Sequence, residues 1–328
     1  VKYQETMMLY RPDTLILDES HYIKNYTTKR ASASIALAKL SKRVICLTGT
    51  PLLTHVPDLF PYFVLAGYYP PVNRAYYAFL NTFTNKEEYK IKGRKVVKYT
   101  GIKNRDQLIK MMKNFTIRRT KDMVTELPPF TETIFFLSKY RDYEGDINLG
   151  TIAQNFELRQ HIMKTRHTTA LKKAMDRNLY EFIDNILEQT DKLVIFVHHR
   201  DVAETVMRNL QKYRPVSISG KDDAEQRALA LHRFKTDPEC RVLVLSIMAG
   251  GVGLNITNAS YAIFLEMDWT YAVMEQAKAR LHRIGQNSHV QIYYAVYDQS
   301  VDHLIARSII AKELLTDEIN RGIEEKKI

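Results

Sequence analysis

Hydrophobic and polar positions alternate most regularly in the second half of the chain. From residue 179 onward, helical stretches with apolar positions three and four residues apart are separated by short, nearly continuous apolar segments typical of buried parallel strands. This order predicts a complete doubly wound α/β domain. The pattern predicts strands at 192–198, 215–219, 241–246, 261–267 and 290–297, and helices at 179–189, 201–213, 223–234, 271–283 and about 300–320.

The beginning of the chain has a shorter stretch of the same pattern. An apolar segment at 14–18, a helical stretch at 28–40 and a second apolar segment at 43–47 predict a βαβ unit. Strands that are apolar along their whole length favour a parallel sheet covered on both faces. We therefore expect residues 1–54 to be part of an α/β domain.

Between these two regions the strand pattern fades. Aromatic and basic segments with helical spacing, such as 106–115, predict a helical insertion at 55–126. The LPP sequence that follows disfavours helix and marks a hinge, so we expect a linker and second insertion at 127–178. The regular α/β domain then occupies 179–300, and a C-terminal helix and tail occupy 301–328.

Charge is concentrated in the insertion. The 328-residue chain has a formal net charge of +11. Residues 86–121 contain thirteen Lys or Arg against three acidic residues, a net charge of +10. Such a patch attracts phosphate backbones and makes binding depend on salt, although a solvated helical face is an alternative interpretation.

The remaining composition restricts the class of protein. At 45% hydrophobic residues the chain can form two packed domains, and no apolar run approaches the roughly 18 residues of a membrane span. The N-terminal sequence does not resemble a signal peptide, so we expect a cytoplasmic or nuclear protein that is not secreted and binds no membrane. Cys46 and Cys240 lie in strand-like segments, which favours small buried residues over a disulfide.

Candidate chemistry begins where the first predicted strand ends. Asp18 and Glu19 follow it directly, and in open α/β sheets functional groups lie beyond the carboxyl ends of the strands. One carboxylate can hold Mg²⁺ through its hydration shell while the other polarises an attacking water. A polar turn after a strand is the alternative interpretation.

Three further stretches lie at equivalent positions. LTGTP (47–51) offers two hydroxyls and a glycine, and SIMAGGVGLN (246–255) has three glycines whose amides can approach phosphates. In QAKARLHRIGQ (276–286), spacings of four and three predict that Gln276, Arg280 and Arg283 share one helical face. Two arginines placed in this way can reach a shared anion. Each stretch alone has an ordinary structural interpretation, but such interpretations do not account for all four stretches in this order.

DESH, LTGTP, GGVGLN and QAKARLHRIGQ together resemble motifs II, III, V and VI of superfamily two helicases, and specifically of Swi/Snf-type DNA-dependent ATPases. HYIKN after Ser20, IRRTKDMVTELPP at 117–129 and HRIGQ in place of HRxGR resemble the same branch. The resemblance covers about residues 5–310. It implies an α/β fold of two RecA-like lobes with doubly wound parallel sheets, the first incomplete, and a helical insertion.

The resemblance also implies roles for residues of the first lobe and the insertion. Asp18 would coordinate Mg²⁺, Glu19 would orient the hydrolytic water, and His21 would couple the nucleotide site to the other lobe. The LTGTP residues Thr48, Gly49 and Thr50 would link this site to a DNA strand. The insertion would lie beside duplex DNA, with contacts from Lys92, Arg94, Lys95, Arg118 and Arg119.

In the second lobe the resemblance assigns residues to both ligands. Gly251 and Gly253 would line the nucleotide cleft, and Arg280 and Arg283 would act as arginine fingers with Gln276 as their partner. Ser246 and Arg200 would lie near the phosphate backbone. The adjacent His198 and His199 should point to opposite faces of a strand end, so we expect no shared zinc ion there.

The implied function is an ATP-dependent, Mg²⁺-dependent DNA translocase or helicase acting on duplex or branched DNA in repair, replication or recombination. Branch migration, fork reversal and strand annealing are the expected activities. The sequence contains no G-x-x-x-x-G-K-[ST] phosphate loop, which the family places upstream of DESH, so we expect a fragment that starts just before motif II. The alternatives are a non-catalytic DNA-binding module, or a motor that obtains this loop from another chain.

Overall fold

The structure is a computed structural model that describes residues 2–49, 56–91, 94–119, 126–140, 142, 156–251, 253–302, 305, 306 and 309. The chain forms two compact units, one extending up to Arg119 and the other running from Thr120 to Lys312. Among the described residues, none of the helices is both long enough and apolar enough to span a membrane.

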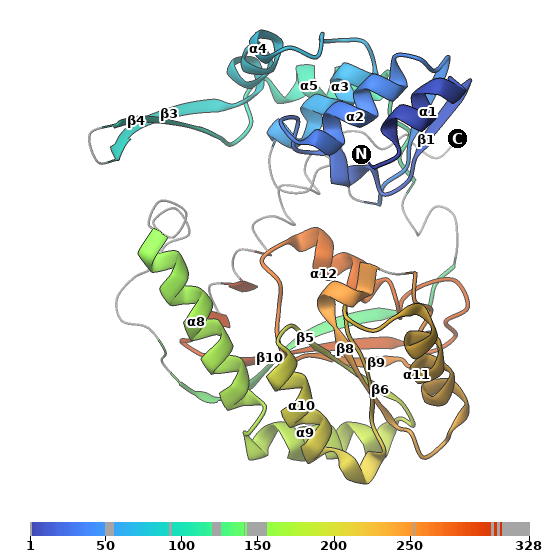
Figure 1. The fold of residues 1–328 in the computed structure, drawn as a ribbon. Helices are drawn as coiled ribbons and strands as arrows, with labels where there is room; N and C mark the ends of the chain where they lie inside the picture. The colour runs from blue at the N-terminus through green and yellow to red at the C-terminus, as the bar shows by residue number, and fades with distance from the viewer. Residues whose placement is uncertain are drawn as a thin grey trace. The chain divides into compact units, whose positions relative to one another are not determined.

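The second unit is built on a six-stranded sheet in which every pairing is parallel (Figure 1). The strand order is β5-β10-β9-β6-β8-β7, so the chain crosses over repeatedly between neighbouring strands. The strands are β5 (Phe130–Lys139), β6 (Leu193–Val197), β7 (Val216–Ile218), β8 (Val242–Ser246), β9 (Tyr261–Phe264) and β10 (Val290–Asp298).

Helices cover both faces of this sheet. Along β6, Val194 and Phe196 enter one hydrophobic core, whereas Leu193, Ile195 and Val197 enter the other. The first core includes side chains of α11 (Ala224–Thr236) and α12 (Tyr271–Lys278), and the second includes those of α9 (Arg177–Gln189) and α10 (Arg200–Asn209). The predicted doubly wound α/β domain is confirmed.

The predicted start of this domain at residue 179 is too late. Strand β5 lies within the expected linker, yet it pairs in parallel with β10 from Phe130 to Lys139. The helix α8 (Phe156–Lys173) also falls in this region, and Ala170 packs in the core. Because β5 is an edge strand with exposed polar positions at 131–133, it lacks the continuous apolar pattern of the central strands.

The first unit contains the predicted βαβ unit. Strands β1 (Thr14–Leu17) and β2 (Arg43–Cys46) pair in parallel, and α2 (Lys29–Ala38) connects them. The hydroxyl of Thr28 caps α2 by accepting a hydrogen bond from the Ala31 amide. The expectation that this sheet is covered on both faces is wrong for the described residues, because Ile16 and Ile45 are 58% and 44% exposed.

An aromatic core holds the helical part of the first unit together. Phe60, Phe63, Phe79 and Phe83 are fully buried where α3 (Phe60–Leu65), α4 (Asn73–Phe83) and α5 (Arg105–Lys113) meet. Outside the insertion, the first unit also contains α1 (Gln4–Tyr10) and the 3-10 turn η1 (Ser20–Ile23); within the insertion, the 3-10 turn η2 (Val56–Leu59) leads into α3. Helical character is thus confirmed for these parts of the insertion.

One basic part of the insertion, within residues 85–100, is instead a β-hairpin. Strands β3 (Asn85–Ile91) and β4 (Arg94–Thr100) pair antiparallel, from Asn85 opposite Thr100 to Ile91 opposite Arg94. The hairpin extends away from α4 in Figure 1. The prediction of helix is wrong here, because β-branched and aromatic residues in β4 favour the extended conformation.

Two other predicted helices differ from the helices that the structure describes. The helix expected at 201–213 is divided into α10 and a 3-10 turn, η3 (Gln211–Tyr213). Of the closing helix expected at about 300–320, residues 301, 302, 305, 306 and 309 are helical and the others lie outside the described residues.

Candidate functional site

The backbone after β1 makes an unusual turn at the DESH sequence. Glu19 has φ 47° and ψ 46°, a left-handed conformation that costs a non-glycine residue about 1–2 kcal/mol. Its amide donates to Asp18 Oδ1 at 2.9 Å, and the next amide, of Ser20, donates to the carbonyl of Leu47 at 2.9 Å. This strained turn is therefore fixed on both sides, and strain of this kind is common at functional sites.

The turn brings the side chains of two predicted motifs together. Glu19 Oε2 lies 3.1 Å from His21 Nδ1, and Thr48 Oγ1 lies 3.5 Å from the same nitrogen. His21 is buried at the start of the 3-10 turn η1 (Ser20–Ile23), and burial lowers the pKa of its imidazole despite the opposing effect of Glu19. Because a carboxylate can only accept, the proton of the neutral ring belongs on Nδ1. Gly49 follows Thr48, whereas Thr50 lies outside the described residues.

Ser20 shows why the third position of DESH must be small. It is 2% exposed, and its hydroxyl lies 3.3 Å from the hydroxyl of Tyr62 on α3. Burial raises the pKa of Tyr62 to about 12, so its hydroxyl stays protonated at neutral pH. No pattern in the sequence indicated this contact, which joins the turn to the aromatic core of the first unit.

The donor set at this turn suits Mg²⁺. Asp18 is exposed, and Mg²⁺ is usually held by one or two carboxylates while it keeps several waters. Among the described residues, no group of three or more His, Cys, Asp or Glu side chains is arranged to hold a metal ion. A hydrated Mg²⁺ on Asp18 would leave Glu19 available for the water.

The predicted helical face of Gln276, Arg280 and Arg283 is wrong. Helix α12 ends at Lys278, so Gln276 lies half-buried within it and both arginines lie in the turns that follow. The apolar spacing in the sequence continues past the end of the helix because Leu281 is fully buried in the core. We call residues 279–286 the arginine turn.

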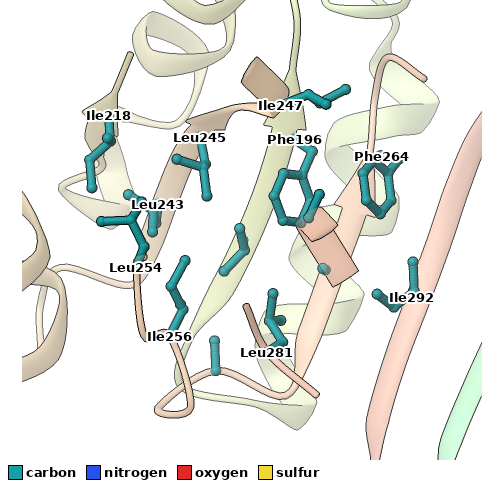
Figure 2. Packing of buried hydrophobic residues seen from close by; sticks show 14 of the residues in the cluster. Phe196, Ile218, Leu243, Leu245, Ile247, Leu254, Ile256, Phe264, Leu281 and Ile292 are labelled. Carbon is teal, nitrogen blue, oxygen red and sulfur yellow. The ribbon is translucent and has the colours of Figure 1, made fainter. Parts of the chain in front are cut away.

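The segment after β8 that contains GGVGLN (250–255) packs against the arginine turn, and we call it the glycine loop. The Ile256 amide donates to the carbonyl of Arg280 at 3.0 Å, and Arg283 Nη1 donates to the carbonyl of Leu254 at 3.2 Å. Figure 2 shows Leu254, Ile256 and Leu281 in one hydrophobic core with the strand residues. The sequence-distant motifs V and VI therefore form a single packed structure.

Glycines permit the sharp bends of both segments. Gly253 has φ +35° and Gly285 has φ +96°, conformations that L-residues with side chains rarely adopt. Gly251 ends the 3-10 turn η4 (Ile247–Gly251), which follows Ser246 directly. Gly253 and Gly285, which belong to the GGVGLN and QAKARLHRIGQ stretches, thus determine the backbone conformation near Arg280 and Arg283.

Polar residues also gather where β6, β8 and β9 end. These strands are neighbours in the sheet, and Ser246 at the end of β8 is in register with Val197 of β6. Arg200 begins α10 just beyond β6, where it is exposed and forms an ion pair with Glu204 at 2.7 Å. Ser246 and Arg200, which were predicted to lie near the DNA phosphate backbone, therefore both lie at the carboxyl ends of neighbouring strands.

Glu266 is a central residue at these strand ends that the sequence reasoning missed. It is 2% exposed, and its Oε2 accepts the amides of His198 and His199 at 2.6 and 2.9 Å, while Oε1 lies 2.6 Å from His199 Nδ1. Burial raises the pKa of Glu266, but these hydrogen bonds outweigh it and hold the pKa below its ordinary value. Glu266 was missed because the expected strand at 261–267 included it, whereas β9 ends at Phe264 and leaves Glu266 beyond the strand.

Charge in the basic hairpin is only partly balanced. Glu88 pairs with Lys86 at 2.5 Å, and Glu87 accepts a hydrogen bond from Thr100 at 2.7 Å. Lys92 lies outside the described residues, and of Arg94 and Lys95 only the backbone of β4 is described. Arg118 and Arg119 follow α5, and Arg119 is exposed.

Comparison with known proteins identifies the class to which this fold and these motifs belong. Residues 177–285 match a helicase conserved C-terminal domain. Residues 1–194, more than half of the chain, match the SNF2-related domain, and the chain therefore belongs to the SNF2-related family.

The curated relatives are considerably longer proteins. The mouse (Mus musculus) DNA annealing helicase and endonuclease ZRANB3 is 26% identical over 332 residues, which is 95% of this chain and 30% of that protein. The Caenorhabditis elegans homolog of SWI/SNF-related matrix-associated actin-dependent regulator of chromatin subfamily A-like protein 1 is 28% identical over 312 residues, 89% of this chain and 43% of that protein. The C-terminal part of the Fun30 ATPase domain aligns with 42% of this chain and 51% of its own at 23% identity and a TM-score of 0.37.

Proposed function

We propose that the full-length protein is an ATP-dependent DNA motor that translocates along duplex or branched DNA. Two RecA-like lobes would bind and hydrolyse ATP with Mg²⁺, and their opening and closing would move the DNA. Fork reversal, branch migration or strand annealing are the activities we infer. Annealing is supported by the similarity to ZRANB3, a DNA annealing helicase that matches 95% of this chain.

The observation that carries this proposal is the turn at Asp18 and Glu19. A strained backbone presents two carboxylates at the carboxyl end of a parallel strand, and one of them contacts His21 beside Thr48. We assign Asp18 to Mg²⁺ and Glu19 to the attacking water. His21 would pass changes at Glu19 to the LTGTP segment.

The second lobe would supply positive charge and DNA contacts. We assign Arg280 and Arg283 to the phosphates of ATP, because arginines stabilise the charge of a transferring phosphoryl group. Gly251, Gly253 and Gln276 would line the same part of the nucleotide site, and Ser246 and Arg200 would contact the DNA backbone. The basic hairpin and Arg118 and Arg119 would hold the duplex.

The substitution Glu19→Gln in the full-length protein tests this proposal. It removes the carboxylate without changing the size of the side chain, so DNA-stimulated ATP turnover should fall by a factor on the order of 10² or more. Affinity for duplex DNA should stay within about twofold, because Glu19 makes no DNA contact in the proposal. Steady-state phosphate release and DNA-binding titrations measure the two quantities.

Glu5→Gln is the matched control, since it removes the same charge from an exposed position in the first turn of α1. It should leave both quantities unchanged. Wild-type turnover in Glu19→Gln would contradict the assignment. A wild-type protein that binds DNA but releases no phosphate would instead identify a non-catalytic DNA-binding module.

A further inference from the structure

The chain around the LPP sequence (127–129) makes two contacts with His282 of the arginine turn and a third with the start of β10. His282 Nε2 lies 3.0 Å from the carbonyl of Pro128, and the ring of His282 stacks on Phe130 with centroids 4.9 Å apart. The carbonyl of Pro129 accepts the Val290 amide at 2.9 Å. All of these residues belong to the second unit.

The hydrogen bond to Pro128 has a defined direction. A peptide carbonyl can only accept, so His282 Nε2 must carry the proton and act as donor. Pro128 has no backbone N–H group, so it cannot donate a hydrogen bond to His282. His282 is therefore suited by both its ring and its donor nitrogen to hold this segment.

A buried lysine adds a second connection between the same elements. Lys278, at the end of α12, is 6% exposed and contacts Glu132 of β5 at 2.9 Å as well as Glu275. Burial lowers the pKa of Lys278, but Glu275 and Glu132 raise it above the ordinary value, so the ammonium is charged. The start of β5 and the end of α12 are thus joined on both sides of Phe130.

His282 occupies a position in the arginine turn where such a contact can affect both arginines. It lies between Arg280 and Arg283, next to Leu281, whose side chain is anchored in the core. On the other side, the carbonyl of Arg280 is held by Ile256. The turn is consequently fixed between the glycine loop and the LPP segment.

We propose that His282 is a positioning residue that couples the LPP segment to the arginine turn, so that a displacement of residues 127–130 changes the placement of Arg280 and Arg283. This coupling rests on the proposed function as a DNA-stimulated ATPase. It gives DNA binding a route to the arginines through the chain segment that leads into the second lobe. His282 itself touches no nucleotide in this scheme.

Two substitutions in the full-length protein separate the contributions of the ring and the donor. His282→Phe keeps the stacking on Phe130 and loses the hydrogen bond, whereas His282→Gln retains an amide donor at a similar reach. His282→Phe should lower the ratio of DNA-stimulated to DNA-free ATP turnover about tenfold, with KM for ATP within twofold. His282→Gln should recover at least half of the wild-type ratio, whereas a general loss of stability would lower both rates together.

Hydrogen exchange measures the anchor independently of catalysis. Peptides that cover residues 126–132 and 288–292 should exchange faster in His282→Phe than in the wild type, because Pro128 and Pro129 lose their fixed position. His232→Phe is the matched control: His232 is exposed on α11, which packs beside β7 at the opposite edge of the sheet from β5. It should change neither the exchange nor the turnover ratio.

Two results would overturn the coupling. One is unchanged exchange at 126–132 in His282→Phe, and the other is faster exchange with a turnover ratio within twofold of wild type. If the wild-type protein shows no ATP turnover, the proposed function fails and the coupling fails with it. In that case the exchange data still show whether His282 anchors the LPP segment.

Discussion

At the scale of single residues, the same sequence signal leads to two different environments. Glu19 and Glu266 both lie just beyond an apolar strand, where the topology of α/β sheets places functional groups. Glu19 is half-exposed and contacts His21, whereas Glu266 is buried and accepts three hydrogen bonds. The position of Glu19 was predicted from the sequence, whereas Glu266 fell inside the expected strand at 261–267. The environment of Glu266 was not predictable, because its donors come from a different strand end.

Replacement of Glu266 should destabilise the second unit in a pH-dependent way. In Glu266→Gln an amide group must face one of the N–H donors, so the unfolding free energy should fall by about 2–3 kcal/mol at pH 7. Because the folded-state pKa of Glu266 is lowered, its contribution is present above the unfolded value of about 4.3 and is lost as pH falls through the folded value. Urea unfolding of both proteins at several pH values between 7 and 3.5 measures this difference.

Glu181→Gln provides the comparison for this measurement. Glu181 forms an exposed i,i+4 ion pair with Arg177, and such pairs contribute about 0.3–0.5 kcal/mol. Its effect should be small at every pH. A Glu266→Gln difference that is equally large at pH 7 and pH 3.5 would show that the ionised carboxylate is not the stabilising species.

At the scale of elements, the sequence predicted central elements well and exposed or terminal ones poorly. Strands β6 and β8 are buried along almost their whole length, so composition alone identified them. Strand β5 and the β3–β4 hairpin were missed because exposed positions interrupt their apolar pattern with polar and basic residues. The end of α12 was predicted too late, since Leu281 continues the apolar spacing after the helical backbone has ended.

The hairpin makes a prediction about DNA binding. Replacing Lys92, Arg94 and Lys95 together with Ala should weaken the affinity of the full-length protein for duplex DNA and reduce its dependence on salt. Removing a single phosphate interaction lowers the slope of log affinity against log salt by about 0.9, so the change should lie between about 0.9 and 2.7. Binding titrations at several salt concentrations give this slope.

A second triple variant separates local contacts from net charge. Three exposed residues lie close to the start of β7 and away from the carboxyl ends of the strands: Arg208 near the end of α10, Lys212 in η3 and Arg214 directly after η3. Their replacement by Ala removes the same charge and should leave the slope within about 0.5 of wild type. Equal slopes for the two triple variants would indicate that the hairpin is a solvated charged surface without specific contacts to DNA phosphates.

At the scale of the whole molecule, the motif order predicted the family and the α/β fold, and both are confirmed. What could not be predicted from the sequence is the contact network within each unit. The packing of Leu254 and Ile256 against the arginine turn and the contact of Ser20 with Tyr62 join segments far apart in the chain. Such contacts depend on the folded topology and leave no local pattern.

We propose that Glu19 of the first lobe and Arg280 of the second act in one ATP hydrolysis reaction. The most direct test is a double-mutant cycle on DNA-stimulated ATP turnover of the full-length protein, with Glu19→Gln, Arg280→Ala and both together. Residues that act as a unit are strongly non-additive, so each single variant should lose a factor on the order of 10² or more and the double variant should lose little beyond that. Losses that multiply in the double variant would contradict the claim.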